Sequence, residues 1–268
     1  MIDRRHFSVA AGASALPGWP APSWAQALDT CRILTGFPAG GTVDLVARRL
    51  ADKLRASYAR VALVENKPGA GGRLAVDELR RSANDGSTLL VTPAAMITLY
   101  PHLYARLSYG IDDVTPVGGV ASVVFGLAAG PGVPESVTTL KDFIAWAQAH
   151  PGMANFGSPG AGSPPHFLGA LLAKETGVAL THVPYRGTVP GIADLLGGQL
   201  TSFSGPIGDY LPHVKTGKLR VLATSGAKRS RFLPEVPTYT ELGHPGLEQV
   251  EWYGVFLPGK AAPELVQR

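Results

Sequence analysis

The chain has 268 residues, of which 45% are hydrophobic and 16% are charged, as in globular proteins with a buried core rather than in disordered chains. Its 24 basic and 20 acidic residues give a net charge of +4. The basic residues are scattered without interleaved aromatic side chains, so we expect no nucleic-acid partner. A single cysteine, Cys31, excludes an internal disulfide and a cysteine-based zinc site.

The first 27 residues have the composition of an export signal. Arg4-Arg5 precedes an apolar, Ala-rich run over residues 7–16, and Ala25-Gln26-Ala27 offers the small side chains that a signal peptidase reads. We expect a signal peptide over residues 1–27, cleaved after about Ala27, and a periplasmic mature protein. Residues 3–7 also resemble a twin-arginine motif, which leaves the export route open.

From residue 32 onward, β-rich runs alternate with segments of helical periodicity. The expected strands cover residues 32–37, 61–64, 87–92, 117–128, 155–157, 181–184 and 219–225; the expected helices cover residues 43–57, 74–83, 139–150, 166–175 and 191–196. This alternation predicts an α/β protein with a largely parallel sheet. We expect the chain to cross twice between two lobes. The first lobe is discontinuous and comprises residues 28–125 plus 229–268, and the second lobe comprises residues 126–228.

The loop from Phe37 through Pro38, Ala39, Gly40 and Gly41 to Thr42 joins an expected strand to an expected helix. Its glycines allow close backbone approach, and a helix start presents free N–H groups to a carboxylate or phosphate. A simple structural turn explains the loop equally well. The pattern matches neither glycine-rich nucleotide motif. Asp44 is expected to be structural, because its carboxylate would repel an anion.

A second loop, residues 157–166, also lies between a strand and a helix. Ser158 and His166 can donate hydrogen bonds to an oxyanion, and Ser163 is a natural N-cap for the helix that follows Gly162. The alternative is an enzyme in which Ser158 or Ser163 acts with His166. Neither serine has the G-x-S-x-G context, and no acidic residue is placed to orient His166. Binding without catalysis, metal or cofactor is therefore favoured.

Two further loops follow expected strands. In residues 182–188, Tyr185 can cover the apolar part of a ligand and the backbone of Gly187 can approach its polar end. Arg186 is a less favoured carboxylate partner. Thr92 ends the strand over residues 87–92. Because ligands of open α/β sheets bind at the carboxyl ends of strands, all four loops are expected to line one cleft.

At these loops the sequence resembles the extracytoplasmic solute receptors of tripartite tricarboxylate transporters, the Bug-type receptors. The resemblance rests on motifs in order over residues 37–44, 65–72, 155–166, 182–187, 194–199, 217–220, 234–238 and 252–254. It implies a two-lobed, type II periplasmic-binding-protein fold with the ligand cleft between the lobes. It also implies a monomer that captures a small carboxylate, a di- or tricarboxylate or an aromatic acid, for the permease subunits of such a transporter. A receptor that reports to a membrane sensor is the alternative.

The resemblance also implies which residues hold the ligand. One lobe would contribute Phe37, Pro38, Ala39, Gly40 and Gly41, and the other Ser158, Gly162, Ser163 and His166, with Tyr185 and Gly187 nearby. The chain departs from the family in having Ser204-Gly205 where an acidic residue is common. Family chains also normally continue beyond the position of Arg268, so we expect terminal helices of the first lobe to be missing.

Overall fold

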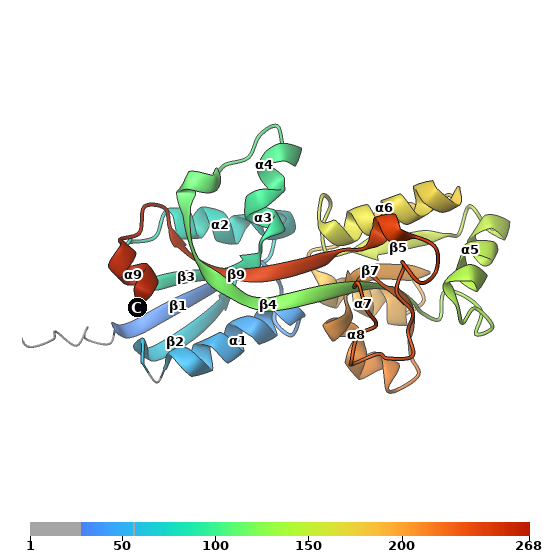
Figure 1. Ribbon diagram of the computed structural model, residues 1–268, viewed down its shortest axis with the longest axis horizontal. Helices are drawn as coiled ribbons and strands as arrows, with labels where there is room; N and C mark the ends of the chain where they lie inside the picture. Colours follow the sequence, from blue (N-terminus) through green and yellow to red (C-terminus); the bar gives the residue numbers. More distant parts are fainter. Residues whose placement is uncertain (1–27, 56) are drawn as a thin grey trace, which may run out of the picture.

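The computed structural model describes residues 28–55 and 57–268, so the expected signal peptide lies outside the described residues (Figure 1). The strands are β1 (Leu28–Thr35), β2 (Ala59–Asn66), β3 (Thr88–Pro93), β4 (Val114–Ala129), β5 (Asn155–Ser158), β6 (Thr181–Pro184), β7 (Ser202–Pro206), β8 (Arg220–Thr224) and β9 (Val250–Pro258). The helices are α1 (Thr42–Leu54), α2 (Arg73–Arg80), α3 (Ala95–Thr98), α4 (Tyr100–Leu103), α5 (Leu140–Ala149), α6 (Pro164–Thr176), α7 (Thr188–Leu196), α8 (Ile207–Val214) and α9 (Pro263–Gln267). Within the described part of the chain, no helix is long and apolar enough to cross a membrane.

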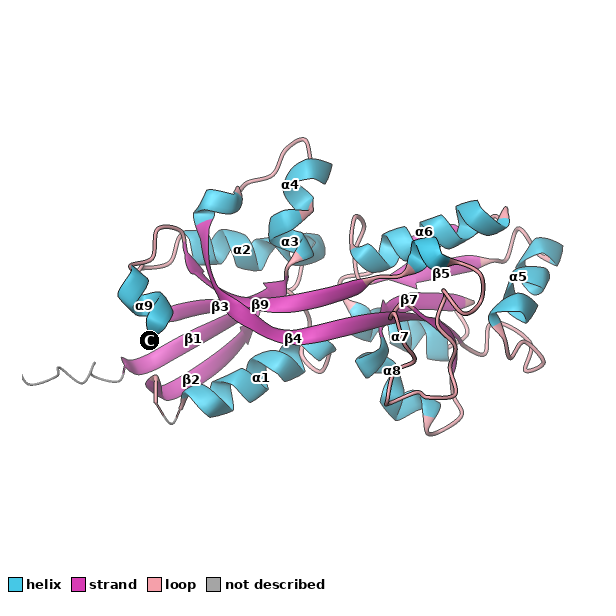
Figure 2. Ribbon diagram, in the orientation of Figure 1, coloured by secondary structure: helices cyan, strands magenta, loops and turns pink. Residues whose placement is uncertain are grey.

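The strands and helices form two α/β lobes, which confirms the predicted fold class (Figure 2). In the first lobe, β2, β1 and β3 are parallel, and β9 pairs antiparallel with β3. In the second lobe, β6, β5 and β7 are parallel, whereas β4 pairs antiparallel with β7 and β8. The expectation of a largely parallel sheet is therefore wrong for the strands that join the lobes, because β4 and β9 run antiparallel to their neighbours.

The two lobes are connected through β4 and β9, which run side by side between them (Figure 1). Residues 114–124 of β4 pair with β9, and residues 125–129 pair with β7 and β8. The return crossing does not lie at residue 229 as expected. Leu233 and Val236 are buried in the same cluster as Phe203, in the second lobe, and the chain returns only along β9. Residues 229–249 lack a periodic pattern, so their packing was not visible in the sequence.

In the first lobe, alternation along β1 separates two buried layers. Cys31 and Ile33 point to the face covered by α1, and Leu34 points to the face covered by α2. In the second lobe the fully buried ring of Phe203 fills space left by glycines. A Cβ at Gly191 would lie 2.0 Å from Phe203 Cε2, so this glycine is required by close packing.

Candidate ligand-binding cleft

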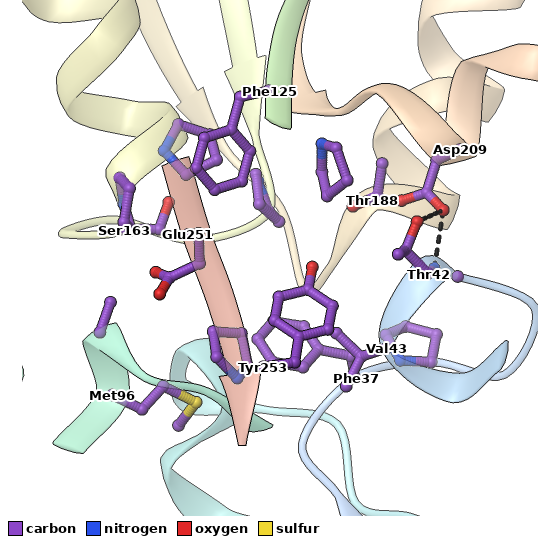
Figure 3. A pocket seen from close by; sticks show the side chains of 18 of the residues that line it. Phe37, Thr42, Val43, Met96, Phe125, Ser163, Thr188, Asp209, Glu251 and Tyr253 are labelled. Carbon is purple, nitrogen blue, oxygen red and sulfur yellow. Dashed lines mark hydrogen bonds between the residues drawn. The ribbon is translucent and has the colours of Figure 1, made fainter. Parts of the chain in front are cut away.

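A cavity lies between the two lobes and is bounded on one side by the strands that join them (Figure 3). It contains about 610 Å³ of empty space, counting the part open to solvent. Its wall is largely apolar, as is usual for small-molecule sites. The lining residues are Phe37, Pro38, Gly41, Thr42, Val43, Pro93, Ala95, Met96, Tyr100, Phe125, Pro159, Ser163, Pro164, Pro165, Thr188, Val189, Pro206, Asp209, Glu251 and Tyr253.

The first loop reaches the cavity with only part of the predicted set. Phe37, Pro38 and Gly41 line it, whereas Ala39 and Gly40 are exposed and lie outside the lining. Gly40 adopts a φ of +87° and donates its N–H to Asp44 Oδ2 at 2.9 Å. That N–H is therefore already used within the protein.

Asp44 is structural, as the sequence analysis expects. Its buried carboxylate accepts hydrogen bonds from Gly40, from Arg48 Nε at 2.8 Å and from Asn66 Nδ2 at 2.9 Å. Burial by itself would raise the pKa of Asp44, but the hydrogen bonds from Arg48, Gly40 and Asn66 outweigh it and hold the pKa below its usual value. Asp44 thus fixes the loop at the start of α1.

In the second loop, Ser163 lines the cavity and also caps α6. Its Oγ donates to the carbonyl of Gly160 at 2.7 Å and accepts from the N–H of His166. Gly162 donates its N–H to His166 Nδ1 at 3.1 Å. Gly162 and His166 lie outside the cavity lining, and the hydrogen bond between them stabilises the loop.

Ser158 is fully buried outside the lining and contacts a histidine that the sequence analysis did not pair with it. Its Oγ lies 2.8 Å from Nε2 of His182, whose ring stacks on that of His166 with centroids 4.0 Å apart. Burial, with a smaller contribution from His166, lowers the pKa of His182 to about 4. The protonated imidazole is thus disfavoured, which makes His182 a poor general base. This pair does not support the enzyme alternative.

In the third and fourth loops, the cavity is lined by neighbours of the predicted residues and not by the predicted residues themselves. The Tyr185 hydroxyl donates to Asp194 Oδ2 at 2.7 Å, and Arg186 is exposed. Thr92 is buried, with Oγ1 2.8 Å from Met96 Sδ. Thr92, Tyr185 and Gly187 lie outside the lining, whereas their neighbours Pro93 and Thr188 line it.

The sequence analysis did not identify two acids that line the cavity, the half-buried Asp209 on α8 and the buried Glu251 on β9. Asp209 Oδ1 accepts from the N–H and the hydroxyl of Thr42 at 2.7 and 2.6 Å, and within the described residues its buried Oδ2 has no partner. Burial raises the pKa of Asp209. It also raises the pKa of Glu251 to about 7, against the opposing effect of backbone N–H donors. Little in the sequence pointed to Asp209, because Pro206 and Pro212 interrupt the patterns of β7 and α8 on either side of it.

The lobes contact each other at the edges of the cavity. The Thr42–Asp209 hydrogen bonds join α1 to α8 (Figure 3). The Tyr104 hydroxyl donates to the carbonyl of Ala161 at 2.8 Å. Gly187 packs directly on Pro38, since a Cβ at Gly187 would lie 2.4 Å from Pro38 Cδ. These contacts hold the lobes in a closed arrangement.

The donor set gives no support for a metal centre. Among residues 28–55 and 57–268, no group of three His, Cys, Asp or Glu side chains is placed to hold a metal ion. The described lining also contains no Lys, Arg or His. The site is thus a largely apolar cavity between the lobes with hydroxyl groups, backbone groups and two carboxyl groups.

Two α/β lobes joined by paired strands and closed around one cavity define the class of periplasmic solute-binding proteins. The family model described as "Tripartite tricarboxylate transporter family receptor", TctC, matches residues 46–268. The chain is 34% identical to Protein BugT of Bordetella pertussis over 237 residues, covering 88% of this chain and 72% of BugT. The chain therefore belongs to the TctC family of solute-binding receptors, which confirms the resemblance seen in the sequence.

Solved structures agree with this assignment. The periplasmic binding protein BugD matches with a TM-score of 0.82 and 29% identity, over 89% of this chain and 79% of BugD. MatC from Rhodopseudomonas palustris, solved with bound malate, matches with a TM-score of 0.77 and 29% identity, over 88% of this chain and 80% of MatC. These neighbours are solute-binding proteins, which fits a receptor rather than an enzyme.

Proposed function

We propose that this protein is a periplasmic receptor that encloses a small carboxylate between its lobes and delivers it to the membrane subunits of a tripartite transporter. The observation that carries the proposal is the cavity itself, which both lobes line and which their mutual contacts close. The bound malate of MatC, a protein with the same fold, supports a carboxylate ligand. Membership in a transporter receptor family supports the membrane partner.

The geometry suits reversible capture better than chemistry. A solute that touches both lobes favours their closed arrangement over any open one, because it gains contacts that only the closed form offers. The loop backbones supply hydrogen-bonding groups, and the aromatic side chains of Phe37, Phe125 and Tyr253 enclose the apolar part. Release then requires only that the lobes separate.

Thermal unfolding of the purified protein tests the proposal. Each member of a panel of carboxylates is compared with its uncharged amide, and the solution is checked by NMR for consumption of the compound. A carboxylate that binds only the folded form should stabilise it by about 2.7 kcal/mol at a hundredfold excess over Kd. Stabilisation by no carboxylate, or turnover of the compound that stabilises, would contradict the proposal.

The transporter partner needs a separate test. The purified receptor, loaded with the acid that stabilises it, is mixed with membranes containing the permease subunits of a tripartite transporter. Ligand-dependent uptake into vesicles is the expected result. Ligand-dependent association with a membrane sensor, with no uptake, would show that the receptor signals instead.

A further inference from the structure

Glu251 lines the cavity but has no role in the proposed capture of a carboxylate. It lies on β9, one of the two strands that join the lobes, and it is only 5% exposed. Its carboxyl group points into the space between the lobes (Figure 3). An acid at this depth is costly to bury unless its oxygens find donors.

Backbone groups satisfy part of that requirement. Oε1 accepts the N–H of Trp252 at 3.1 Å, whereas the N–H of Ala94, which follows β3, donates to the carbonyl of Trp252 at 2.9 Å. The N–H groups of Trp252 and Ala94 are therefore both used within the protein and are not free for a carboxylate on the solute. No described lining residue is a cation that could balance Glu251.

Asp209, the second acid in the cavity, carries the same negative charge as Glu251 when it is ionised. Asp209 lines the cavity from the other lobe, with a buried Oδ2 that lacks a partner in the described part of the chain. A solute with carboxylates at both ends would bring a further negative group into a poorly hydrated space that already contains two acids, and like charges at short range oppose binding. A group with N–H donors and a positive charge would instead be attracted.

The surrounding rings favour the same group. Phe37, Tyr100, Phe125 and Tyr253 line the cavity together with Glu251. The faces of aromatic rings attract cations, most strongly where water is excluded. A cavity lined by both a carboxyl acceptor and aromatic rings is thus a suitable environment for an ammonium group.

We infer that Glu251 determines specificity by accepting hydrogen bonds from an ammonium group, so that the preferred solute is an amino acid, with one carboxylate and one ammonium, rather than a dicarboxylate. This inference rests on the proposed function, because it concerns the solute of the same cavity. It assigns the carboxylate of the solute to backbone groups of the loops, and its ammonium to Glu251.

Calorimetric titration with matched compounds tests the inference. The probes are α-amino acids (alanine, valine, leucine), ω-amino acids (β-alanine, γ-aminobutyrate, ε-aminocaproate) and dicarboxylates (succinate, glutarate, adipate). At slightly alkaline pH, we expect at least one amino acid to bind about tenfold or more tightly than every dicarboxylate, equivalent to about 1.4 kcal/mol. Glu251→Gln, which keeps the shape of the side chain, should remove this preference.

Two variants keep the test interpretable. Glu235→Gln changes an exposed glutamate of the second lobe and should bind like the unaltered protein. Glu251→Asp keeps the charge but withdraws it from the cavity, and it should also weaken amino-acid binding while leaving weak dicarboxylate binding unchanged. Cooperative thermal unfolding of each variant checks that it is folded.

The outcomes separate the inference from the proposed function. Dicarboxylates that bind as tightly as amino acids, or a preference for amino acids that survives Glu251→Gln, would overturn the inference and leave a carboxylate receptor. Binding of none of these acids would also overturn the inference, whereas the proposed function fails only if no carboxylate of the wider thermal-unfolding panel stabilises the protein.

Discussion

Gly187 offers a direct test of whether closure of the lobes creates the binding site. Its φ of +101° and ψ of 175° lie in a region that is essentially restricted to glycine. A Cβ at this position would lie 2.4 Å from Pro38 Cδ, across the contact between the lobes. Gly187→Ala therefore combines local backbone strain with a steric overlap that exists only while the lobes are closed.

The two effects differ in what they change. Backbone strain of about 1–3 kcal/mol lowers the stability of the folded protein whether or not a solute is bound. Carbon atoms need about 3.5–4.0 Å, so relief of the overlap requires the loops to separate by about 1 Å. The Thr42–Asp209 hydrogen bonds, now 2.6 and 2.7 Å long, would then exceed ordinary hydrogen-bond length. Their loss costs about 1–3 kcal/mol, which weakens ligand binding about tenfold to hundredfold.

Titration calorimetry with the acid that stabilises the protein measures this change. The matched control is Gly177→Ala, because Gly177 also has a positive φ, +69°, but a Cβ there would contact nothing within 4 Å. Gly177→Ala should lower the unfolding temperature and leave Kd unchanged, whereas Gly187→Ala should lower the unfolding temperature and raise Kd. Equal Kd values for Gly187→Ala and Gly177→Ala would refute the reasoning that the closed contact contributes to binding.

Three further predictions concern stability. Burial raises the folded-state pKa of Glu251 from 4.5 to about 7. Between these pH values the folded form binds more protons than the unfolded one, so the free energy of unfolding should fall as pH rises, by up to about 3 kcal/mol. Denaturant titrations should show a flatter pH dependence of this free energy for Glu251→Gln, and equal slopes for the two proteins would contradict the assignment. Leu34→Ala, at a fully buried position, should cost about 2–5 kcal/mol in chemical denaturation, and a loss below about 1 kcal/mol would mean that the site repacks. Gly191→Ala places a Cβ 2.0 Å from Phe203 and should cost about 1–3 kcal/mol by overpacking, whereas an unchanged melting temperature would show that the ring of Phe203 can move.

Local patterns in the sequence predicted several elements and caps in both lobes. Apolar periodicity located α1 and α2, and the cap at Ser163 and the structural role of Asp44 were predicted from residue type and position. These features depend on neighbours a few residues apart, which a sequence shows directly.

The elements that the sequence analysis missed include α8 and β9, which carry the two cavity acids. β7 and α8 were not predicted, because Gly205, Pro206 and Pro212 interrupt the patterns of both. β9 was not predicted either, so Glu251 was not identified. Its depth in the cleft depends on pairing with β3 and β4, far away in the sequence.

By itself, the sequence determined that the chain alternates strands and helices, that glycine-rich loops follow several strands, and which receptor family it resembles. Only the tertiary structure decided which loop residues face the cavity: Pro93 rather than Thr92, Thr188 rather than Gly187, and Ser163 rather than Ser158. The physical reason is that strand and helix formation depends on local periodicity, whereas the lining of a cleft between lobes depends on long-range strand pairing and on contacts such as Thr42–Asp209, which no local pattern encodes.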